Sequence, residues 1–426
     1  MRAFSALLLS FPALFLISGC ALTPTAASGP LPGAAFNGTV HGGQQAIVQA
    51  HVHLMAAAAN GYGKPSISLL NSALTGVPDT IGAYVLTDGS GEFTITGDYV
   101  CVPATQVYIY VTGGDPGSGE NSAVGLMTAL GSCPVAGTFA ITNPNVEVNE
   151  LTTIAAAYAL SGFATDALHI SSSGTAPALI GISNAFLNAG NLVENVNGTA
   201  LATTPAGNGT VPQQEINLIG NILSSCINSG GPSSSACTTL FTNTLANGTT
   251  GAQPTDVAGA AINLAHNPST NIGALYGIPV ASPPFGPALP YQPVDFTIAL
   301  KFTGGGVSEN DSFGKTIAVA GDGSVWQATG GGLAAKLSSL GVPISPSTGF
   351  GAGIGGGENY MMVDETGNGY ALVGGINYGF YKWGPSGAIL APANGFLTGD
   401  THSAGSNAIA FDPAGNIWAT NFFQQA

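Results

Sequence analysis

The order of apolar and polar residues divides the chain into three blocks. In the first, residues 36–148, apolar residues alternate with polar ones, as at Ala50, Val52 and Leu54. Residues two apart lie on the same face of a β-strand, so this block predicts short strands with one buried face. Glycine-rich turns separate the strands, which favours an antiparallel β-sandwich.

From about residue 149 the spacing of apolar residues changes to three and four. Leu151, Ile154, Ala155 and Tyr158 follow the i, i+3, i+4, i+7 pattern of one helix face. Further helices are expected near residues 179–193, 212–227, 233–247 and 255–267. The sequence therefore predicts an α-helical domain over residues 149–278.

Capping and proline residues mark the expected boundaries. Thr210 and Thr255 precede apolar runs and are the expected N-caps of two helices. Residues 279–294 carry six prolines, a composition typical of a semi-rigid, polyproline-like linker. We therefore expect a domain boundary at this segment.

The last block, residues 295–426, contains a repeat. Three turn glycines recur 44 and 48 residues apart, each followed three residues later by an aromatic residue. These pairs are Gly323 and Trp326, Gly367 and Tyr370, and Gly415 and Trp418. A period near 45 with strand-turn-strand content is typical of β-propeller blades, and the block has room for about three.

Two stretches resemble known families. The repeat pattern of an apolar residue, Asp, two residues, Gly, Asn and an aromatic residue resembles NHL-type repeats and streptogramin-lyase-like propellers. In the first block, "GTVHGGQQAIVQAHVHL" and "TDGSGEFTI" resemble carboxypeptidase-regulatory-like, immunoglobulin-type sandwiches. The expected fold is multidomain and mainly β: an antiparallel β-sandwich, an α-helical domain and an incomplete propeller. NHL-type propellers close with about six blades.

The composition restricts the classes of partner. Charged residues make up 6% of the 426 residues, Lys and Arg total six, and the formal net charge is −15. Phosphate contacts need a basic surface, so a nucleic-acid partner is not expected. Apolar residues make up 45%, enough to build buried cores.

The N-terminus predicts export. A basic start and a short apolar run lead to Ile17-Ser18-Gly19-Cys20, which resembles the lipobox of bacterial lipoproteins. The resemblance implies a signal peptide at 1–19, lipidation of Cys20, a flexible tether at 20–35 and a location at the outer membrane or cell surface. An ordinary signal peptide with an incidental cysteine is the alternative.

Four further cysteines predict two disulfides, because exported chains are oxidised. Three pairings are open, and Cys101–Cys133 with Cys226–Cys237 is favoured because each pair lies within one block. Metal binding is the alternative, but the chain has no CxxC motif and no histidine at ligand spacing from these cysteines.

Two further groups of residues could bind a metal ion, but each also has an ordinary structural explanation. His51 and His53 could share a metal, but they are expected to face solvent, opposite the apolar face of their strand. Asp322, Asp364 and Asp412 could bind calcium, but aspartate also suits the tight turns in which they lie. No metal and no other cofactor is assigned.

The predicted function is that of a non-catalytic cell-surface lipoprotein, a binding or scaffolding module that uses its sandwich and propeller surfaces. One alternative is a streptogramin-lyase-like eliminative or hydrolytic enzyme, although no catalytic residue can be carried over. A non-functional truncated product of a longer gene is another. The expected partners are the membrane through Cys20, a protein or glycan ligand, and further copies through open propeller edges.

Overall fold

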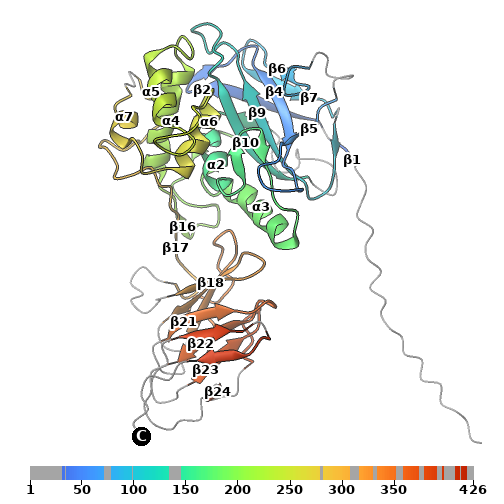
Figure 1. The fold of residues 1–426 in the computed structure, drawn as a ribbon, viewed down its shortest axis with the longest axis vertical. Helices are drawn as coiled ribbons and strands as arrows, with labels where there is room; N and C mark the ends of the chain where they lie inside the picture. Colours follow the sequence, from blue (N-terminus) through green and yellow to red (C-terminus); the bar gives the residue numbers. More distant parts are fainter. Residues whose placement is uncertain are drawn as a thin grey trace, which may run out of the picture.

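The computed structural model describes residues 31–33, 35–71, 78–97, 99–133, 145–278, 282–307, 316–329, 333–351, 358–373, 379–390, 396–397, 408–412 and 414–419. The predicted signal peptide, Cys20 and most of the tether lie outside these residues. The described part is mainly β, with several small sheets, six helices and two hydrophobic cores (Figure 1). None of its helices is long and apolar enough to cross a membrane.

Two main sheets and one separate strand pair form the N-terminal part of the fold. Their strands are β1 (Leu31–Pro32), β2 (Phe36–Gly42), β3 (Gln45–Ala46), β4 (His51–Ala56), β5 (Ile67–Ser68), β6 (Val85–Leu86), β7 (Glu92–Ile95), β8 (Val100–Cys101), β9 (Gln106–Thr112), β10 (Gly125–Ser132) and β11 (Asn145–Val148). The larger sheet has the order β10-β9-β4-β5, with β6 also on β4; the smaller has β11-β2-β3, with β7 also on β2. Strands β1 and β8 pair separately.

One strand pair departs from the expected antiparallel arrangement. Strand β11 runs parallel to β2, with Glu147 opposite Thr39. A parallel pair needs a long connection, and 102 residues separate the end of β2 from the start of β11. This direction takes β11 straight into the first helix.

The helices are α2 (Glu150–Ala159), α3 (Ala176–Ala189), α4 (Gln213–Ile227), α5 (Ser235–Asn243), α6 (Val257–His266) and α7 (Ile272–Tyr276). Short strands lie between them: β12 (Ala164–Asp166), β13 (His169–Ile170), β14 (Val193–Glu194) and β15 (Thr199–Ala200). All five helices predicted from the apolar spacing are present, and α7 is additional.

Both expected helix caps are wrong. Thr210 pairs with Lys301 in a short β-ladder, and α4 begins after Pro212. Asp256 caps α6 in place of Thr255, accepting a hydrogen bond from Gly259 N at 2.8 Å. A carboxylate at this position also interacts favourably with the positive end of the helix dipole.

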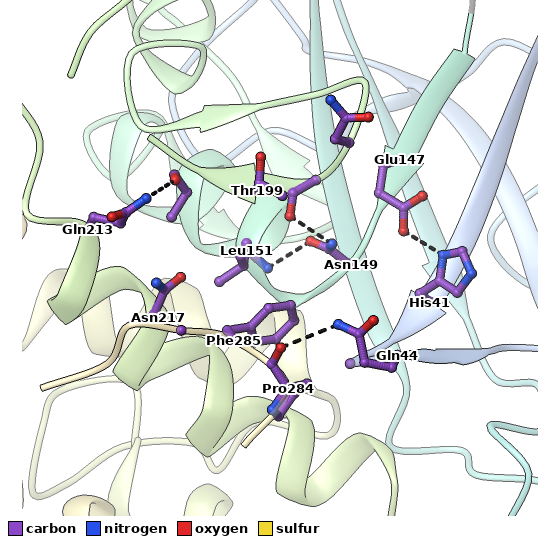
Figure 2. A pocket seen from close by; sticks show the side chains of 15 residues that line it. His41, Gln44, Glu147, Asn149, Leu151, Thr199, Gln213, Asn217, Pro284 and Phe285 are labelled. Carbon is purple, nitrogen blue, oxygen red and sulfur yellow. Dashed lines mark hydrogen bonds and ion pairs between the residues drawn. The ribbon is translucent and has the colours of Figure 1, made fainter. Parts of the chain in front are cut away.

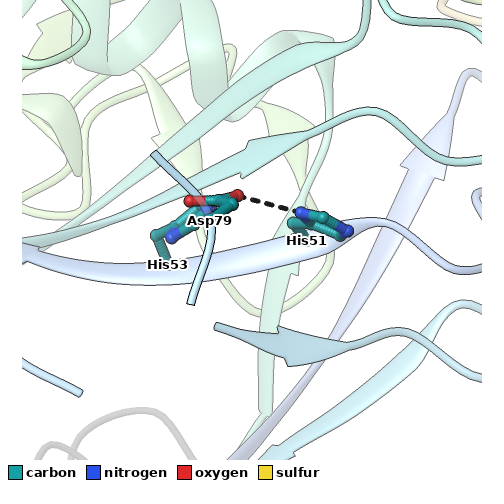
Figure 3. Close-up of side chains that lie close together, drawn as sticks. All are labelled: His51, His53 and Asp79. Atoms are coloured by element: carbon teal, nitrogen blue, oxygen red, sulfur yellow. Dashed lines mark hydrogen bonds and ion pairs between the residues drawn. The ribbon is translucent and has the colours of Figure 1, made fainter. Parts of the chain in front are cut away.

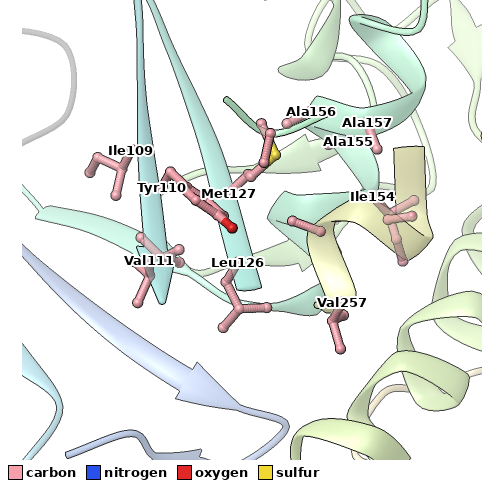
Figure 4. Packing of buried hydrophobic residues seen from close by; sticks show 14 of the residues in the cluster. Ile109, Tyr110, Val111, Leu126, Met127, Ile154, Ala155, Ala156, Ala157 and Val257 are labelled. Atoms are coloured by element: carbon pink, nitrogen blue, oxygen red, sulfur yellow. The ribbon is translucent and has the colours of Figure 1, made fainter. Parts of the chain in front are cut away.

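The helices cover the face of the larger sheet that lies opposite Val52 and Leu54. The alternation of apolar and polar residues predicts that this face is exposed to solvent. Tyr108 and Tyr110 lie on this face, and their hydroxyl groups donate to Ala167 O at 2.7 Å and Asp256 Oδ2 at 2.9 Å. Figure 4 shows Tyr110 and Met127 of the sheet in the same buried cluster as Ile154 of α2 and Val257 of α6. One core therefore joins strands and helices, and the boundary predicted near residue 149 marks a change of secondary structure within it.

The described part of the proline-rich segment also packs on this core. Phe285 and Leu289 are buried, and Asn221 of α4 both donates to Phe285 O at 2.9 Å and accepts from its N–H at 3.0 Å. In its described part, residues 282–294, the segment is therefore held on α4 and does not act as a free linker.

The C-terminal part consists of small antiparallel sheets. Its strands are β18 (Ile317–Val319), β19 (Val325–Thr329), β20 (Leu333–Leu337), β21 (Glu358–Val363), β22 (Gly369–Val373), β23 (Gly379–Trp383), β24 (Phe396–Leu397), β25 (Ile409–Phe411) and β26 (Ile417–Ala419). They form the sheets β18-β19-β20, β21-β22-β23-β24 and β25-β26. A second core around Trp326 and Trp383 packs the first two sheets together.

Helix α3, the residues just after it and a short β-ladder hold this part to the rest of the chain. Asn184, Asn188 and Asn191 donate to Asp322 O, Ser339 O and Leu340 O at 3.1, 3.0 and 3.2 Å. Strand β16 (Gly209–Thr210) pairs with β17 (Lys301–Phe302). The contact is thus made by amide groups and backbone, while each core stays separate.

Replacing the cap of α2 should destabilise the N-terminal core. The Asn149 side chain accepts from Leu151 N and Thr152 N and donates to Gly198 O at 2.9 Å. Asn149→Ala should therefore lower the free energy of unfolding by about 2 kcal/mol. Urea unfolding followed by helical circular dichroism measures the change, because every described helix lies in this part of the chain.

Thr175→Ala is the matched control. Thr175 occupies the same position before α3 but makes no side-chain capping bond and is exposed. Its replacement should change stability by less than about 0.5 kcal/mol. Equal effects of the two substitutions would show that the α2 cap contributes nothing specific.

Candidate functional site

A cavity of about 350 Å³ opens where the smaller sheet, α2, α4 and the proline-rich segment meet (Figure 2). Strand β2 contributes His41 and β11 contributes Glu147. Helix α4 contributes Gln213 and Asn217, and Phe285 comes from the proline-rich segment. Segments far apart in sequence therefore build one polar pocket with an aromatic wall.

The parallel pairing of β2 and β11 creates the charged side of the cavity. Glu147 stands opposite Thr39, and His41 lies two residues further along the same face of β2. Thr39 Oγ1 donates to Glu147 Oε2, and His41 Nδ1 lies 2.7 Å from Glu147 Oε1. The hydrogen bond to Glu147 raises the pKa of His41 above its usual 6.5.

Glu150 lies behind this pair, at the start of α2, and is fully buried. Both of its carboxyl oxygens lie 3.0 Å from Gly43 N. Burial raises the pKa of Glu150 to about 8, because the charged form loses its hydration inside the protein. At neutral pH this carboxyl group is therefore mostly protonated.

Amide side chains form much of the remaining lining. Gln44, Gln213 and Asn217 donate to the carbonyl oxygens of Pro284, Ala200 and Pro287 at 3.3, 2.6 and 2.8 Å. No donor among the described residues contacts the amide oxygens of these three side chains. The N–H groups thus hold the frame of the cavity, and the oxygens can accept hydrogen bonds from a ligand.

A glycine turn closes one side of the cavity. Gly198 has φ of +60°, and a Cβ atom there would lie 2.3 Å from Asn149 Nδ2 and 2.4 Å from Glu147 Cγ. Only glycine combines this left-handed backbone with so close an approach. The turn between β14 and β15 can therefore lie directly against the strand-helix junction.

Comparison with known protein families, curated proteins and solved structures finds no match. The function is therefore inferred from the geometry of the chain itself.

Three of the predicted disulfide residues, Cys133, Cys226 and Cys237, are buried in the N-terminal core and do not line the cavity. Cys226, at the end of α4, is bonded to Cys237 in α5, which is the predicted pairing and connects the two helices. Cys133 is also disulfide-bonded. The side chain of Cys101 lies outside the described residues, so its pairing with Cys133 stays a prediction.

The six repeat residues occupy equivalent places in three hairpins. Gly323, Gly367 and Gly415 have φ of +84°, +82° and +80° and complete the turns. Three aromatic residues follow in the returning strands, at equivalent ladder positions: Trp326 opposite Ala318, Tyr370 opposite Met362, and Trp418 opposite Ala410.

The aspartates of these turns bind their own backbone. Asp364 Oδ1 accepts from Thr366 N and Asn368 N at 2.9 Å, and Asp412 Oδ1 accepts from Ala414 N and Asn416 N. In the first turn Ala320 occupies the position that Asp364 and Asp412 hold in the other two. Asp322 lies two residues later, and its Oδ1 accepts from Ser324 N at 2.8 Å. These hydrogen bonds explain the three aspartates as residues that stabilise tight turns, without the need for a role in calcium binding.

The expectation for His51 and His53 is wrong in one respect. His53 is fully buried and His51 partly so, because the chain around Ala83 and Tyr84 crosses this face of β4. Burial lowers the pKa of His53 below 6.5. Alternation identified the shared face of the two residues but not the segment that covers it.

Sequence reasoning missed His41, Glu147 and Glu150 altogether. The only local signal is a pair of acidic residues in the run "NVEVNELTTIAAA", where a buried strand meets a buried helix. Acidic residues are rarely buried without partners, so this run predicts a partner elsewhere in the chain. The partner, His41, lies 106 residues away.

The buried Glu150 predicts that stability falls as pH rises. Between about pH 4.5, the usual pKa, and about pH 8, the unfolded chain has lost the proton that the folded chain keeps. The free energy of unfolding should fall across this interval by up to about 1.4 kcal/mol per pH unit from this group. His41 acts in the same direction, since its folded pKa is also raised.

Glu150→Gln isolates this contribution, because an amide mimics the protonated carboxyl group. Urea unfolding of the variant, followed by circular dichroism, should depend less steeply on pH than that of the unmodified chain. Glu120→Gln, at an exposed position, should leave the slope unchanged. Parallel pH profiles for Glu150→Gln and the unmodified chain would contradict the assignment.

Proposed function

We propose that the chain is an exported, lipid-anchored, non-catalytic binding protein whose cavity takes a hydroxyl-rich ligand of the saccharide class. The observation that carries this proposal is the acceptor-rich lining: the amide oxygens of Gln44, Gln213 and Asn217 beside the Glu147 carboxylate. Hydroxyl groups donate hydrogen bonds to such oxygens. A ligand with several hydroxyl groups could satisfy them together.

The aromatic wall supports the same class of ligand. Phe285 lines the cavity beside Leu151, and its ring provides an apolar surface next to the polar groups. A saccharide has apolar C–H faces as well as hydroxyl edges, so it matches both kinds of surface. Ligand sites generally combine an apolar wall with a few polar groups that fix the orientation.

The finer architecture forms part of the proposal. The two N-terminal sheets share one core, which supports a β-sandwich covered by helices on one side. Three hairpins with equivalent turns and ladder positions support blades of an incomplete NHL-type propeller. Such blades would offer a scaffolding surface separate from the cavity.

Saccharide binding can be tested with the full chain by ligand-observed NMR, using chitobiose, cellobiose and maltose as probes. At least one disaccharide should bind saturably. Gln44→Ala and Phe285→Leu should each raise its dissociation constant about fivefold, the effect of losing an interaction worth about 1 kcal/mol. Gln292→Ala, an exposed glutamine outside the cavity, is the matched control and should bind normally.

Lack of binding to all three probes would contradict the saccharide proposal. Binding that survives in both cavity variants would show that the ligand sits elsewhere.

Lipid anchoring predicts a separate outcome for Cys20. Cys20→Ser removes the thiol that would carry the lipid, so the chain should move from the membrane fraction to the soluble fraction. Intact-mass analysis should find lipid on the unmodified chain and none on the variant. An unmodified Cys20 thiol in membrane-extracted protein would contradict the anchor.

A further inference from the structure

A second cluster of polar side chains lies on β4, and none of its members lines the cavity. His51 and His53 project from the same face of the strand, and Asp79 comes from the segment before β6 (Figure 3). Asp79 Oδ2 lies 2.9 Å from His51 Nδ1 and 3.2 Å from His53 Nε2. The three ligand atoms all lie within 4.8 Å of one another.

His53 is held in the form that a metal ligand requires. Its Nδ1 lies 3.2 Å from Ala83 O, and a carbonyl oxygen can only accept, so Nδ1 carries the proton. In the neutral ring the lone pair is then on Nε2. This atom is buried and makes no hydrogen bond of acceptable geometry, although the Asp79 oxygen is close.

Two electron-rich atoms thus face each other inside the protein. A lone pair on His53 Nε2 next to a carboxylate oxygen is unfavourable, and a metal ion between the two atoms removes the repulsion, as a second proton on the ring would. A backbone carbonyl that fixes the outer nitrogen of a histidine is the usual support of a metal-binding imidazole.

Backbone hydrogen bonds fix the orientation of the Asp79 carboxylate. Its Oδ1 accepts from Ile81 N at 2.8 Å and from Gly82 N at 3.2 Å, which leaves Oδ2 directed at the two imidazoles. His51 is fixed by Tyr84, whose ring stacks on it with centroids 3.7 Å apart. The backbone and one aromatic ring therefore direct all three side chains toward one point before any ion is bound.

We propose that His51, His53 and Asp79 form a binding site for a divalent transition-metal ion of the zinc class. Zinc binds imidazole nitrogen and carboxylate oxygen at about 2.0–2.2 Å, which places neighbouring tetrahedral ligands about 3.3 Å apart. The separations of 2.9 and 3.2 Å from Asp79 Oδ2 are close to this spacing. Small shifts of the two partly exposed side chains, His51 and Asp79, would admit the ion.

The ligand types determine the class of ion. Two imidazoles and one carboxylate suit zinc and its neighbours, whereas calcium and magnesium prefer oxygen ligands throughout. Three protein ligands leave a fourth position, which faces solvent because the His51 and Asp79 side chains are 35% and 24% exposed. The bound ion ties the segment before β6 to β4.

Zinc titration of the chelator-treated full chain, without a polyhistidine tag, tests the site. Isothermal titration calorimetry should show one ion per chain with micromolar or tighter affinity, and millimolar calcium or magnesium should not compete. His51→Ala and Asp79→Asn should each weaken zinc binding at least about tenfold. Asparagine retains the acceptor for Ile81 and Gly82, so Asp79→Asn should preserve the fold.

His169→Ala is the matched control. His169 also pairs with an aspartate, Asp166, at 2.8 Å, but no third ligand lies near it among the described residues. Its replacement should leave zinc affinity within about twofold of the original.

The visible spectrum of the cobalt-loaded, unmodified chain gives a test that does not depend on the variants. Intense d–d bands of four- or five-coordinate cobalt are expected, and zinc should abolish them. No saturable zinc binding, the weak spectrum of hexa-aqua cobalt, or unchanged affinity in both ligand variants would each overturn the proposal.

Discussion

The larger N-terminal sheet is buried on both faces, and much of the structure depends on this constraint. One face packs on the smaller sheet and the other on helices. Every polar group caught between these layers needs a partner, because an unpaired buried group costs about 1–3 kcal/mol. Tyr108 and Tyr110 meet this requirement through Ala167 O and Asp256 Oδ2.

Asp256 shows how one residue can serve two layers. Its Oδ1 caps α6, while Oδ2 accepts from Tyr110, so the start of the helix is docked on the sheet by a single carboxylate. A helix side chain also binds the edge strand of the larger sheet, because Met127 N of β10 donates to Thr153 Oγ1 of α2 at 2.9 Å. Covering an edge strand in this way removes its open hydrogen-bonding groups.

Both candidate sites arise where this layered packing is interrupted. The cavity forms at the junction of β11 and α2, where Glu147, Asn149 and Glu150 follow one another closely. The histidine cluster forms where the segment before β6, rather than a helix, covers β4. The C-terminal hairpins are separate from both sites. Their turn aspartates bind their own backbone, and the first sheet contacts Asn184 and Asn188 of α3 and Asn191 just after it.

Local periodicity determined many of the elements of this protein. The change from alternation to helical spacing near residue 149, the helices up to His266 and the three equivalent turns all depend on residues within a few positions of each other. The Cys226–Cys237 bond could also be predicted, because both residues lie in one short helical hairpin.

Tertiary structure decided what each face packs against. The burial of His53, the pairing of His41 with Glu147 and the docking of the prolines on α4 join residues 30 to 106 positions apart. Such contacts depend on the order of strands in a sheet and on the layer that covers it, which local spacing does not encode.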